Sequence, residues 1–318
     1  MSILAGDIGA TKTILAIHDE HGLQAKRRFA SKDYPSFDEL LKEFIGKHDV
    51  TSACFGAPGP VINGVVKTTN LRWTLDARKL ARTLGCPVGL INDVEAMAFG
   101  LPQLLPHDAA LAVGKRHTGN ATKALLAPGT GLGMAFLHWT GTHHDVIASE
   151  GGHADFAPRT ALEWELKTHL RKTLGYAGTE AVLSGPGLRN IYDFLKHRQF
   201  ARQDPQMREA LRTQGARAIT EGAYRNDPLC KGAIELFTHA LMHETQRVAL
   251  TGKALGGVYL AGGVVRHLVP FIRTSAFAKH YHDNRRMRRL LELIPVHLVL
   301  NDELGLLGAL KFARTRVR

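Results

Sequence analysis

The 318-residue sequence has few cysteines and no long apolar run, and both absences narrow the classes of protein it can belong to. No stretch approaches the roughly 20 uncharged apolar residues that cross a bilayer. The N-terminus enters a strand-like run without the basic and then apolar segment of a secretory leader. Cys54, Cys86 and Cys230 are an odd number without paired metal-ligand spacing, so we expect reduced packing residues rather than disulfides or a zinc cluster. We expect a cytoplasmic protein without membrane association.

A concentrated basic patch is also lacking, although the formal net charge is +12. Proteins that bind nucleic acids cluster Lys and Arg to neutralise backbone phosphates, whereas here the basic residues are dispersed along the chain. The densest run, His280–Arg289, is flanked by apolar segments, and we interpret it as the solvated face of one helix. We therefore expect no nucleic-acid partner.

The N-terminal part of the sequence alternates apolar runs with turns and amphipathic stretches, as an α/β fold does. Apolar runs at Ile3–Ala5 and Ile14–Ile17 flank the small and polar set Gly6–Thr13, which predicts a strand, a tight turn and a strand. Further strands are predicted at residues 52–57, 61–68 and 88–91, and helices at residues 36–48, 76–84 and 95–99.

A second α/β pattern begins near Ala109, and its opening is predicted to repeat the organisation of the first. Strands are expected at residues 109–113, 124–127, 134–137, 258–261 and 296–300, and helical regions at residues 160–197 and 204–252. A final helix at residues 304–313 is expected to return to the first lobe. A chain of this length exceeds the size at which one hydrophobic core stops growing. We therefore expect two α/β lobes, residues 1–103 with 302–318, and a larger, more helical lobe of residues 104–301.

Two turns rich in small residues are candidates for phosphate binding, one in each predicted lobe. The first is GDIGATKT, at residues 6–13, and the second is APGTGLG, at residues 127–133. Neither matches the spacing of a P-loop or of G-x-G-x-x-G. Backbone amides in such turns can approach an anion closely, although a hairpin without a ligand has the same composition. A third turn, Gly262-Gly263, is placed to contact a nucleoside.

Asp93 lies where the strand predicted at residues 88–91 meets a helix, the position at which open α/β sheets gather their ligands. Phosphoryl transfer from ATP needs Mg²⁺ held by carboxylates and a base within reach of the accepting hydroxyl. Asp7 and Asp93 are the candidates for these two roles. Asp93 has a simpler alternative role as a cap of the helix that follows it.

Six motifs of this sequence resemble the bacterial glucokinase family, in the same order along the chain. They span Gly6 to Val265 and read GDIGATKT, LINDVEAMAFG, LAPGTGLG, SEGGHADFAPR, EAVLSGPGLRNIY and YLAGGVV. The resemblance implies the sugar kinase and actin-like ATPase superfamily, with two ribonuclease H-like lobes around a cleft. It also implies a cytoplasmic homodimer that phosphorylates the 6-hydroxyl of D-glucose with ATP, at the entry to glycolysis.

The resemblance implies a role for each matching residue of the sugar site. Asp93 matches the catalytic base, and the residues that bind the sugar are Asn92, Asp93, Glu150, His153 and Glu180. Carboxylates accept hydrogen bonds from vicinal hydroxyls, which suits recognition of a sugar. Simpler readings remain open, because Glu180 is also placed to begin a helix and His153 to lie in a loop. The two glycines between Glu150 and His153 allow both side chains to converge.

The resemblance also implies an ATP site with Mg²⁺. The phosphates would be bound by Asp7, Gly9, Ala10, Thr11, Lys12, Gly129, Thr130 and Gly131, with Gly262 and Gly263 beside the adenosine. Asp7 would hold Mg²⁺ directly or through water. Two residues depart from the family pattern: Ala10 stands where glycine is usual, and Lys12 where a neutral residue is common. These departures leave the donor open among ATP, ADP and polyphosphate.

Two alternatives to a glucose kinase of this family are kept. A kinase of another hexose or of an N-acetylhexosamine would use the same ring of side chains. A sugar sensor or repressor built on the kinase fold is a distant alternative, because no helix-turn-helix precedes the first predicted strand. The related ROK family is disfavoured, because it has a cysteine-rich zinc motif after its sugar-site histidine, whereas Cys230 is the only cysteine of this chain in that part of the sequence. The resemblance is therefore to the glucokinase group proper.

Overall fold

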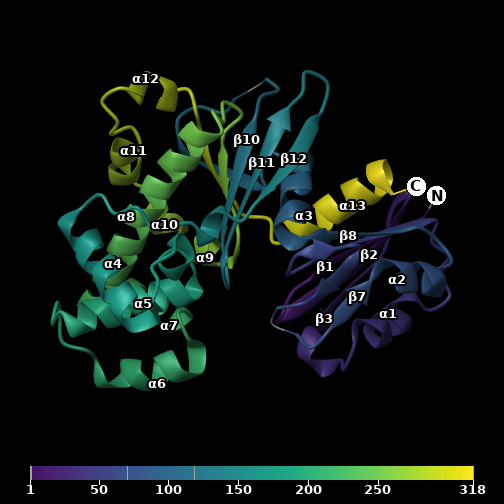
Figure 1. Cartoon of the computed structure of the whole chain (residues 1–318), viewed down its shortest axis with the longest axis horizontal. Coiled ribbons are helices and arrows are strands. Elements are labelled where there is room, and N and C mark those ends of the chain that lie inside the picture. The colour runs from purple at the N-terminus through teal and green to yellow at the C-terminus, as the bar shows by residue number, and fades with distance from the viewer. Residues whose placement is uncertain (1, 70, 118, 318) are drawn as a thin grey trace. The chain divides into compact units, whose positions relative to one another are not determined.

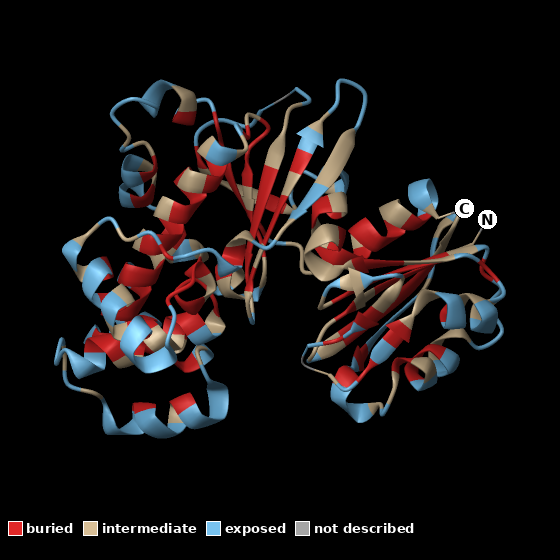
Figure 2. Cartoon of the chain, in the orientation of Figure 1, coloured by how far each residue is buried: buried red, intermediate tan, exposed pale blue. Residues whose placement is uncertain are grey.

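The computed structural model describes residues 2–69, 71–117 and 119–317, and it divides into two compact units. The smaller unit comprises Met1–His107 and Asn301–Arg318, and the larger unit comprises Asp108–Leu300. The sequence places these boundaries at residues 103/104 and 301/302. Each unit has a sheet of its own, with buried residues along its strands (Figure 2).

The sheet of the smaller unit has five strands in the order β3-β2-β1-β4-β8 (Figure 1). They are β1 (Ile3–Ile8), β2 (Lys12–Asp19), β3 (Gly22–Ala30), β4 (Ser52–Ala57) and β8 (Val88–Asn92). β1, β2 and β3 pair antiparallel, whereas β1, β4 and β8 pair parallel. The parallel strands therefore end at one edge of the sheet. Asp7 pairs with Gly56 of β4, and Asn92 pairs with the next β4 residue, Ala57.

Helices cover both faces of this sheet. Alternate residues of each strand point to opposite faces, so neighbouring apolar residues pack against different helices. Leu4 packs in the cluster that holds α1 (Phe37–Ile45) and α2 (Ala77–Leu84). Ala5 packs in the cluster that holds α3 (Asp93–Gly100) and α13 (Leu304–Arg316). Short 3₁₀ turns are η1 (Ser31–Asp33) and η2 (Leu101–Gln103).

The helices α3 and α13 are in backbone contact through glycine. A Cβ on Gly308 of α13 would overlap the carbonyl oxygen of Ala96 in α3, and one on Gly100 would overlap the carbonyl oxygen of Leu304. The C-terminal helix thus belongs to the smaller unit, although the larger unit separates it from α3 in sequence. It carries the chain back to the edge of the sheet at which Asp7 lies.

A separate three-stranded sheet consists of β5 (Val61–Ile62), β6 (Val65–Lys67) and β7 (Thr74–Asp76). The prediction of one strand over residues 61–68 was wrong, because the chain reverses at Asn63-Gly64. Both turn residues have positive φ, 52° and 76°, which is the conformation that a two-residue hairpin requires. Asn-Gly is the sequence most typical of this turn.

The sheet of the larger unit has six strands in the order β12-β11-β10-β13-β14-β9. They are β9 (Ala109–Val113), β10 (Lys123–Pro128), β11 (Leu132–Trp139), β12 (His144–Ser149), β13 (Val258–Leu260) and β14 (Val296–Val299). From β12 to β14 the order and the pairing senses repeat those of the smaller unit. The repeat therefore opens at β10 and not at Ala109 as predicted, since β9 is an added antiparallel strand beside β14.

The larger unit is also the more helical one, as predicted. Its helices are α4 (Ala161–Leu174), α5 (Gly185–His197), α6 (Pro205–Gln214), α7 (Arg217–Tyr224), α8 (Pro228–Thr251), α9 (Gly263–His267), α10 (Val269–Ile272), α11 (Ser275–Tyr281) and α12 (Arg288–Leu291). Two 3₁₀ turns, η3 (Gly151–His153) and η4 (Thr179–Ala181), carry predicted site residues. The long helix α8 is buried along much of its length in the core of this unit (Figure 2).

The basic run His280–Arg289 is not one helix, contrary to the prediction. It covers the end of α11, a turn and the start of α12. The side chain of Asn284 accepts a hydrogen bond from the backbone N–H of Met287 at 3.1 Å, which stabilises the turn. Arg285 and Arg286 are exposed, whereas Tyr281 in the same run is fully buried, so only the arginine part of the run is solvated as expected.

Two further expectations concern the cysteines and membrane spans. All three cysteines are free and buried, as predicted. Among the described helices, none combines the length and the apolar character that a membrane span needs.

Candidate active site

Asp7 and Asp93 share the edge of the smaller sheet at which the parallel strands end. Asp7 lies near the end of β1, and Asp93 is the first residue of α3, directly after β8. Loss of solvation raises the pKa of Asp7 to about 6, and the negative charge of Asp93 adds to this shift. Lys12 lowers the pKa of Asp7 in part, and Glu303 raises it. The structure therefore brings the two predicted carboxylates together, close enough for their charges to interact.

Asn92, and not Asp93, is the N-cap of α3. Its Oδ1 atom accepts hydrogen bonds from the backbone N–H groups of Val94 at 2.9 Å and Glu95 at 3.4 Å. Its Nδ2 atom donates to the carbonyl oxygen of Gly59 at 3.1 Å. Both acceptor positions of Asn92 are thus used, which leaves one N–H of its amide to reach a ligand. Asp93 Oδ1 accepts a hydrogen bond from Val94 N at 3.0 Å.

Ser31 stabilises the turn between β1 and β2 by hydrogen bonds. It is a buried residue that was not predicted from the sequence. Its hydroxyl donates to the carbonyl oxygen of Gly9 at 2.6 Å, and its backbone N–H donates to the carbonyl oxygen of Thr11 at 3.3 Å. The hydroxyl of Thr13 lies 2.9 Å from that of Ser31. Ser31 follows β3, a strand that the apolar pattern did not indicate, so no sequence signal connected it to the turn.

Lys12, one of the departures from the family pattern, forms an ion pair inside the smaller unit. Its Nζ atom donates to Asp302 Oδ2 at 3.0 Å, and Arg28 contacts the same oxygen at 2.9 Å. Asp302 lies two residues before α13. Because it is far from Lys12 in the sequence, the sequence pattern did not predict this ion pair. The ammonium group of Lys12 is thus positioned by a carboxylate at the same end of the sheet as Asp7.

Gly305, in the first turn of α13, lies directly against Asp7. A Cβ atom at this position would be 2.9 Å from both Cγ and Oδ1 of Asp7, closer than side chains tolerate. The absence of a side chain at residue 305 therefore leaves the space that the Asp7 carboxylate occupies. Gly305 belongs to none of the sequence motifs that predict ligand binding.

Glu180 is fixed on the second glycine turn, within the larger unit. The backbone N–H of Leu132 donates to Glu180 Oε2 at 2.8 Å, and a Cβ on Gly131 would overlap the same oxygen. Gly129 donates its N–H to the carbonyl oxygen of Gly131 at 2.8 Å and accepts one from Gly185 at 2.8 Å. The residue predicted to bind sugar and the turn predicted to bind phosphate are therefore adjacent. Glu180 is the middle residue of η4, and this turn has no side-chain cap hydrogen bond among its described residues.

The turn at Gly262-Gly263 lies beside the second glycine turn. Gly262 has φ +92°, and a Cβ there would come within 2.5 Å of the carbonyl oxygen of Pro128. A Cβ on Gly129 or on Gly263 would meet no atom within 4 Å, so both backbones face open space. The larger unit thus presents two accessible glycine backbones side by side.

Glu150 and His153 converge across η3. Glu150 Oε2 lies 3.8 Å from His153 Nε2, and both side chains are well exposed. A Cβ on Gly152 would overlap the carbonyl oxygen of Leu132, so the turn packs closely on β11. The turn η4 lies beside η3, because the backbone N–H of Thr179 donates to the carbonyl oxygen of Ala154 at 2.8 Å. Glu150, His153 and Glu180 therefore lie on neighbouring turns of one unit.

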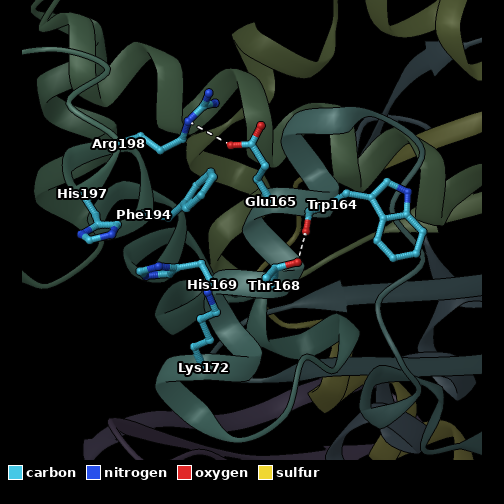
Figure 3. A pocket seen from close by; sticks show the side chains of 8 residues that line it. All are labelled: Trp164, Glu165, Thr168, His169, Lys172, Phe194, His197 and Arg198. Atoms are coloured by element: carbon cyan, nitrogen blue, oxygen red, sulfur yellow. Dashed lines mark hydrogen bonds and ion pairs between the residues drawn. The ribbon is translucent and has the colours of Figure 1, made fainter.

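A pocket of about 370 Å³ in the larger unit contains none of these residues. It is formed by α4 and α5 and is lined by Trp164, Glu165, Thr168, His169, Lys172, Phe194, His197 and Arg198 (Figure 3). Arg198 bridges to Glu165 at 3.1 Å across the two helices. This pocket carries no group that the sequence analysis assigned to a ligand.

Comparison with known proteins identifies the family. A glucokinase family model matches residues 4–316. The glucokinase of Nostoc sp. (strain PCC 7120) is 37% identical over 333 residues, covering 96% of this chain and 97% of the relative. This chain belongs to the glucokinase family. The predicted resemblance is thereby confirmed.

Solved structures of glucokinases share the fold. A glucokinase from an Antarctic psychrotroph has a TM-score of 0.86 at 26% identity, with 98% of both chains covered. A ROK family glucokinase from Streptomyces griseus, solved in complex with glucose and AMPPNP, has a TM-score of 0.65 at 21% identity, with 99% of both chains covered. The α/β fold class with two repeated sheets is confirmed by the glucokinase structures and by the strand orders above.

Proposed function

We propose that this glucokinase family member transfers the γ-phosphoryl group of ATP to the 6-hydroxyl of D-glucose. The observation that carries the proposal is the pair of interacting carboxylates, Asp7 and Asp93, at the carboxyl edge of the smaller sheet. One carboxylate suits a metal–phosphate group and the other a hydroxyl proton. The family match over nearly the whole chain supports glucose as the acceptor.

Asp93 is proposed as the general base. Its carboxylate accepts the proton of the 6-hydroxyl as that oxygen forms a bond to the γ-phosphorus. The bond between the γ-phosphorus and the bridging oxygen breaks in the same displacement, and the electron pair leaves with ADP. The backbone N–H of Val94 holds Asp93 Oδ1 at 3.0 Å, which orients the carboxylate before substrate arrives.

Four further side chains are proposed to bind the glucose hydroxyls. Glu150, His153 and Glu180 offer acceptors and a ring nitrogen on neighbouring turns of the larger unit. Asn92 contributes the one amide N–H that is not bonded to the carbonyl oxygen of Gly59. A sugar lacking a matching hydroxyl would leave these polar groups unpaired, which costs binding free energy.

The ATP phosphates are proposed to contact the turns at residues 9–12 and 129–131, and the adenosine Gly262 and Gly263. The open backbone at Gly129 and Gly263 fits such an approach. Asp7 is a suitable ligand for Mg²⁺. Burial and the charge of Asp93 disfavour its ionised form, and a neighbouring cation would stabilise that form. When bound, Mg²⁺ neutralises charge on the transferring phosphate. The family resemblance also supports a cytoplasmic homodimer at the entry to glycolysis.

The role of Asp93 is tested by the variant Asp93→Asn. Turnover should fall by at least about 100-fold, because an amide cannot accept the hydroxyl proton, while glucose affinity measured by calorimetry should stay within a few-fold. Asp49→Asn is the matched control, since Asp49 is an exposed loop carboxylate of the same unit. Near-normal turnover in Asp93→Asn would remove Asp93 from this role.

A further inference from the structure

Three potential metal ligands meet in the larger unit at a place that the proposed kinase chemistry does not use. Glu163 lies in the first turn of α4 and is fully buried. His239 and His243 are one helical turn apart on α8, so both face the same side of that helix. Their imidazole rings lie 4.4 Å apart between centroids.

Two of the three separations between the ligand atoms are close to those of a zinc site. Glu163 Oε1 lies 3.1 Å from His239 Nδ1 and 3.4 Å from His243 Nδ1, and all three atoms fall within 4.8 Å of one another. Ligands placed about 2.0–2.1 Å from a tetrahedral Zn²⁺ are about 3.3 Å from each other. Two of the three separations therefore already match a zinc tetrahedron.

The carboxylate is aimed at the histidines by its own backbone contacts. Glu163 Oε2 accepts N–H groups from Arg159 at 2.6 Å and Thr160 at 3.1 Å, as part of the capping box of α4. These bonds leave Oε1 directed at His239 and His243. Outer contacts of this kind orient the carboxylate ligands of metal sites.

Hydrogen bonding alone does not satisfy this cluster. His239 Nδ1 bonds to Glu163 Oε1 at 3.1 Å. His243 Nδ1 is buried and lies 3.4 Å from the same oxygen, at ion-pair distance, and no hydrogen-bond donor or acceptor among the described residues meets it with good geometry. A buried ring nitrogen without a partner is costly, and a bound cation would satisfy it.

A route for a fourth ligand exists on the solvent side. A pocket of about 360 Å³ is lined by His239 together with residues of α8, α10 and α11, and it includes His280. The His280 ring lies 5.4 Å from that of His239. Water from this pocket, or His280 after a change of its side-chain conformation, would complete four-coordination beside His239.

We propose that Glu163, His239 and His243 form a binding site for a zinc-like divalent cation. Two nitrogens and one oxygen favour Zn²⁺ or Co²⁺ over Mg²⁺, which prefers oxygen ligands alone. The cation ties the start of α4 to the middle of α8, so it stabilises the larger unit and takes no part in phosphoryl transfer. The site is independent of the proposed kinase function.

The proposal is tested by titrating the chelator-treated full-length protein with Co²⁺ and with Zn²⁺. We expect one equivalent to bind, with the visible absorption of four-coordinate Co²⁺ and a rise in melting temperature with Zn²⁺. The variant His239→Gln/His243→Gln should lose at least about 100-fold in affinity, because even outer-contact losses cost 10–100-fold. A tenfold excess of Mg²⁺ should not displace Co²⁺.

The matched control is His169→Gln/His197→Gln, which removes a pair of neighbouring histidines elsewhere in the same unit (Figure 3). This control should keep wild-type affinity. X-ray absorption of the zinc-loaded wild-type protein gives a second readout that needs no variant, with two or three imidazole ligands expected. Unchanged affinity in the His239/His243 variant, no stoichiometric binding by the wild type, or absorption without two imidazoles would each overturn the proposal.

Discussion

Asp7 illustrates how a single residue links the fold to the chemistry. Its pKa rises from 3.8 to about 6, first through loss of solvation and then through the charge of Asp93. The folded state therefore binds this proton more tightly than the unfolded state does. This carboxyl thus makes the folded protein progressively less stable as pH rises from about 4 to about 6, and the penalty is constant above that window.

Replacing Asp7 by Asn should relieve this penalty. We expect Asp7→Asn to melt about 2–4 °C higher than the wild type at pH 7.5, with a smaller difference at pH 5. Turnover with ATP should fall, because an amide is a poorer Mg²⁺ ligand than a carboxylate. Calorimetric melting at both pH values measures the effect, with Asp49→Asn as the control. An equal difference at both pH values would contradict the assigned pKa of Asp7.

Residue types and spacing predicted some residues of the candidate site, but not the residues that position them. Asp93 was recognisable because it follows a buried strand and precedes a helix, and the structure places it beside Asp7. Ser31 and Gly305 act on Asp7 and the first turn through contacts between distant parts of the sequence. Neither residue belongs to a motif, so one sequence holds no signal for it.

At the scale of elements, the helix α13 sets the position of Asp7 through its first turn. The variant Gly305→Ala should displace the Asp7 carboxylate, because the added Cβ would lie 2.9 Å from Cγ. A misplacement of about 1 Å at a reacting group costs about 100-fold in rate. We expect a fall of that order in turnover, measured at saturating glucose with varied ATP.

Stability should not fall in parallel with turnover in Gly305→Ala, because alanine favours a helix over glycine by about 1 kcal/mol. Thr315→Ala, at an exposed position of the same helix, is the control. Unaltered turnover in Gly305→Ala would show that the packing of α13 does not position Asp7.

Elements with strong local signals were predicted well, and those defined by pairing were not. The strand at Ser52–Ala57 has the predicted bounds, and α1 and α2 lie within the helices predicted at residues 36–48 and 76–84. The strand β3 is largely exposed, so its composition resembles a loop. Its pairing with β2 is a tertiary contact that periodicity does not report.

At the scale of the whole molecule, the two units have the same sheet order, and the sequence predicted only the opening of this repeat. β3-β2-β1-β4-β8 and β12-β11-β10-β13-β14 share both order and pairing senses. The glycine turn after the first strand recurs in both, at residues 9–11 and 129–131. The predicted pair of phosphate turns thus occupies equivalent positions of a repeated fold.

The most direct test of the proposed function is an assay of sugar phosphate formation by the wild-type protein. Glucose, mannose, fructose and N-acetylglucosamine are each paired with ATP, ADP and polyphosphate, with and without Mg²⁺. The account predicts product with glucose, ATP and Mg²⁺, and little with any other combination. Turnover with another sugar or donor would keep the fold and reassign the substrate. Glucose binding without turnover for any pair would contradict the account and place the protein among sugar sensors.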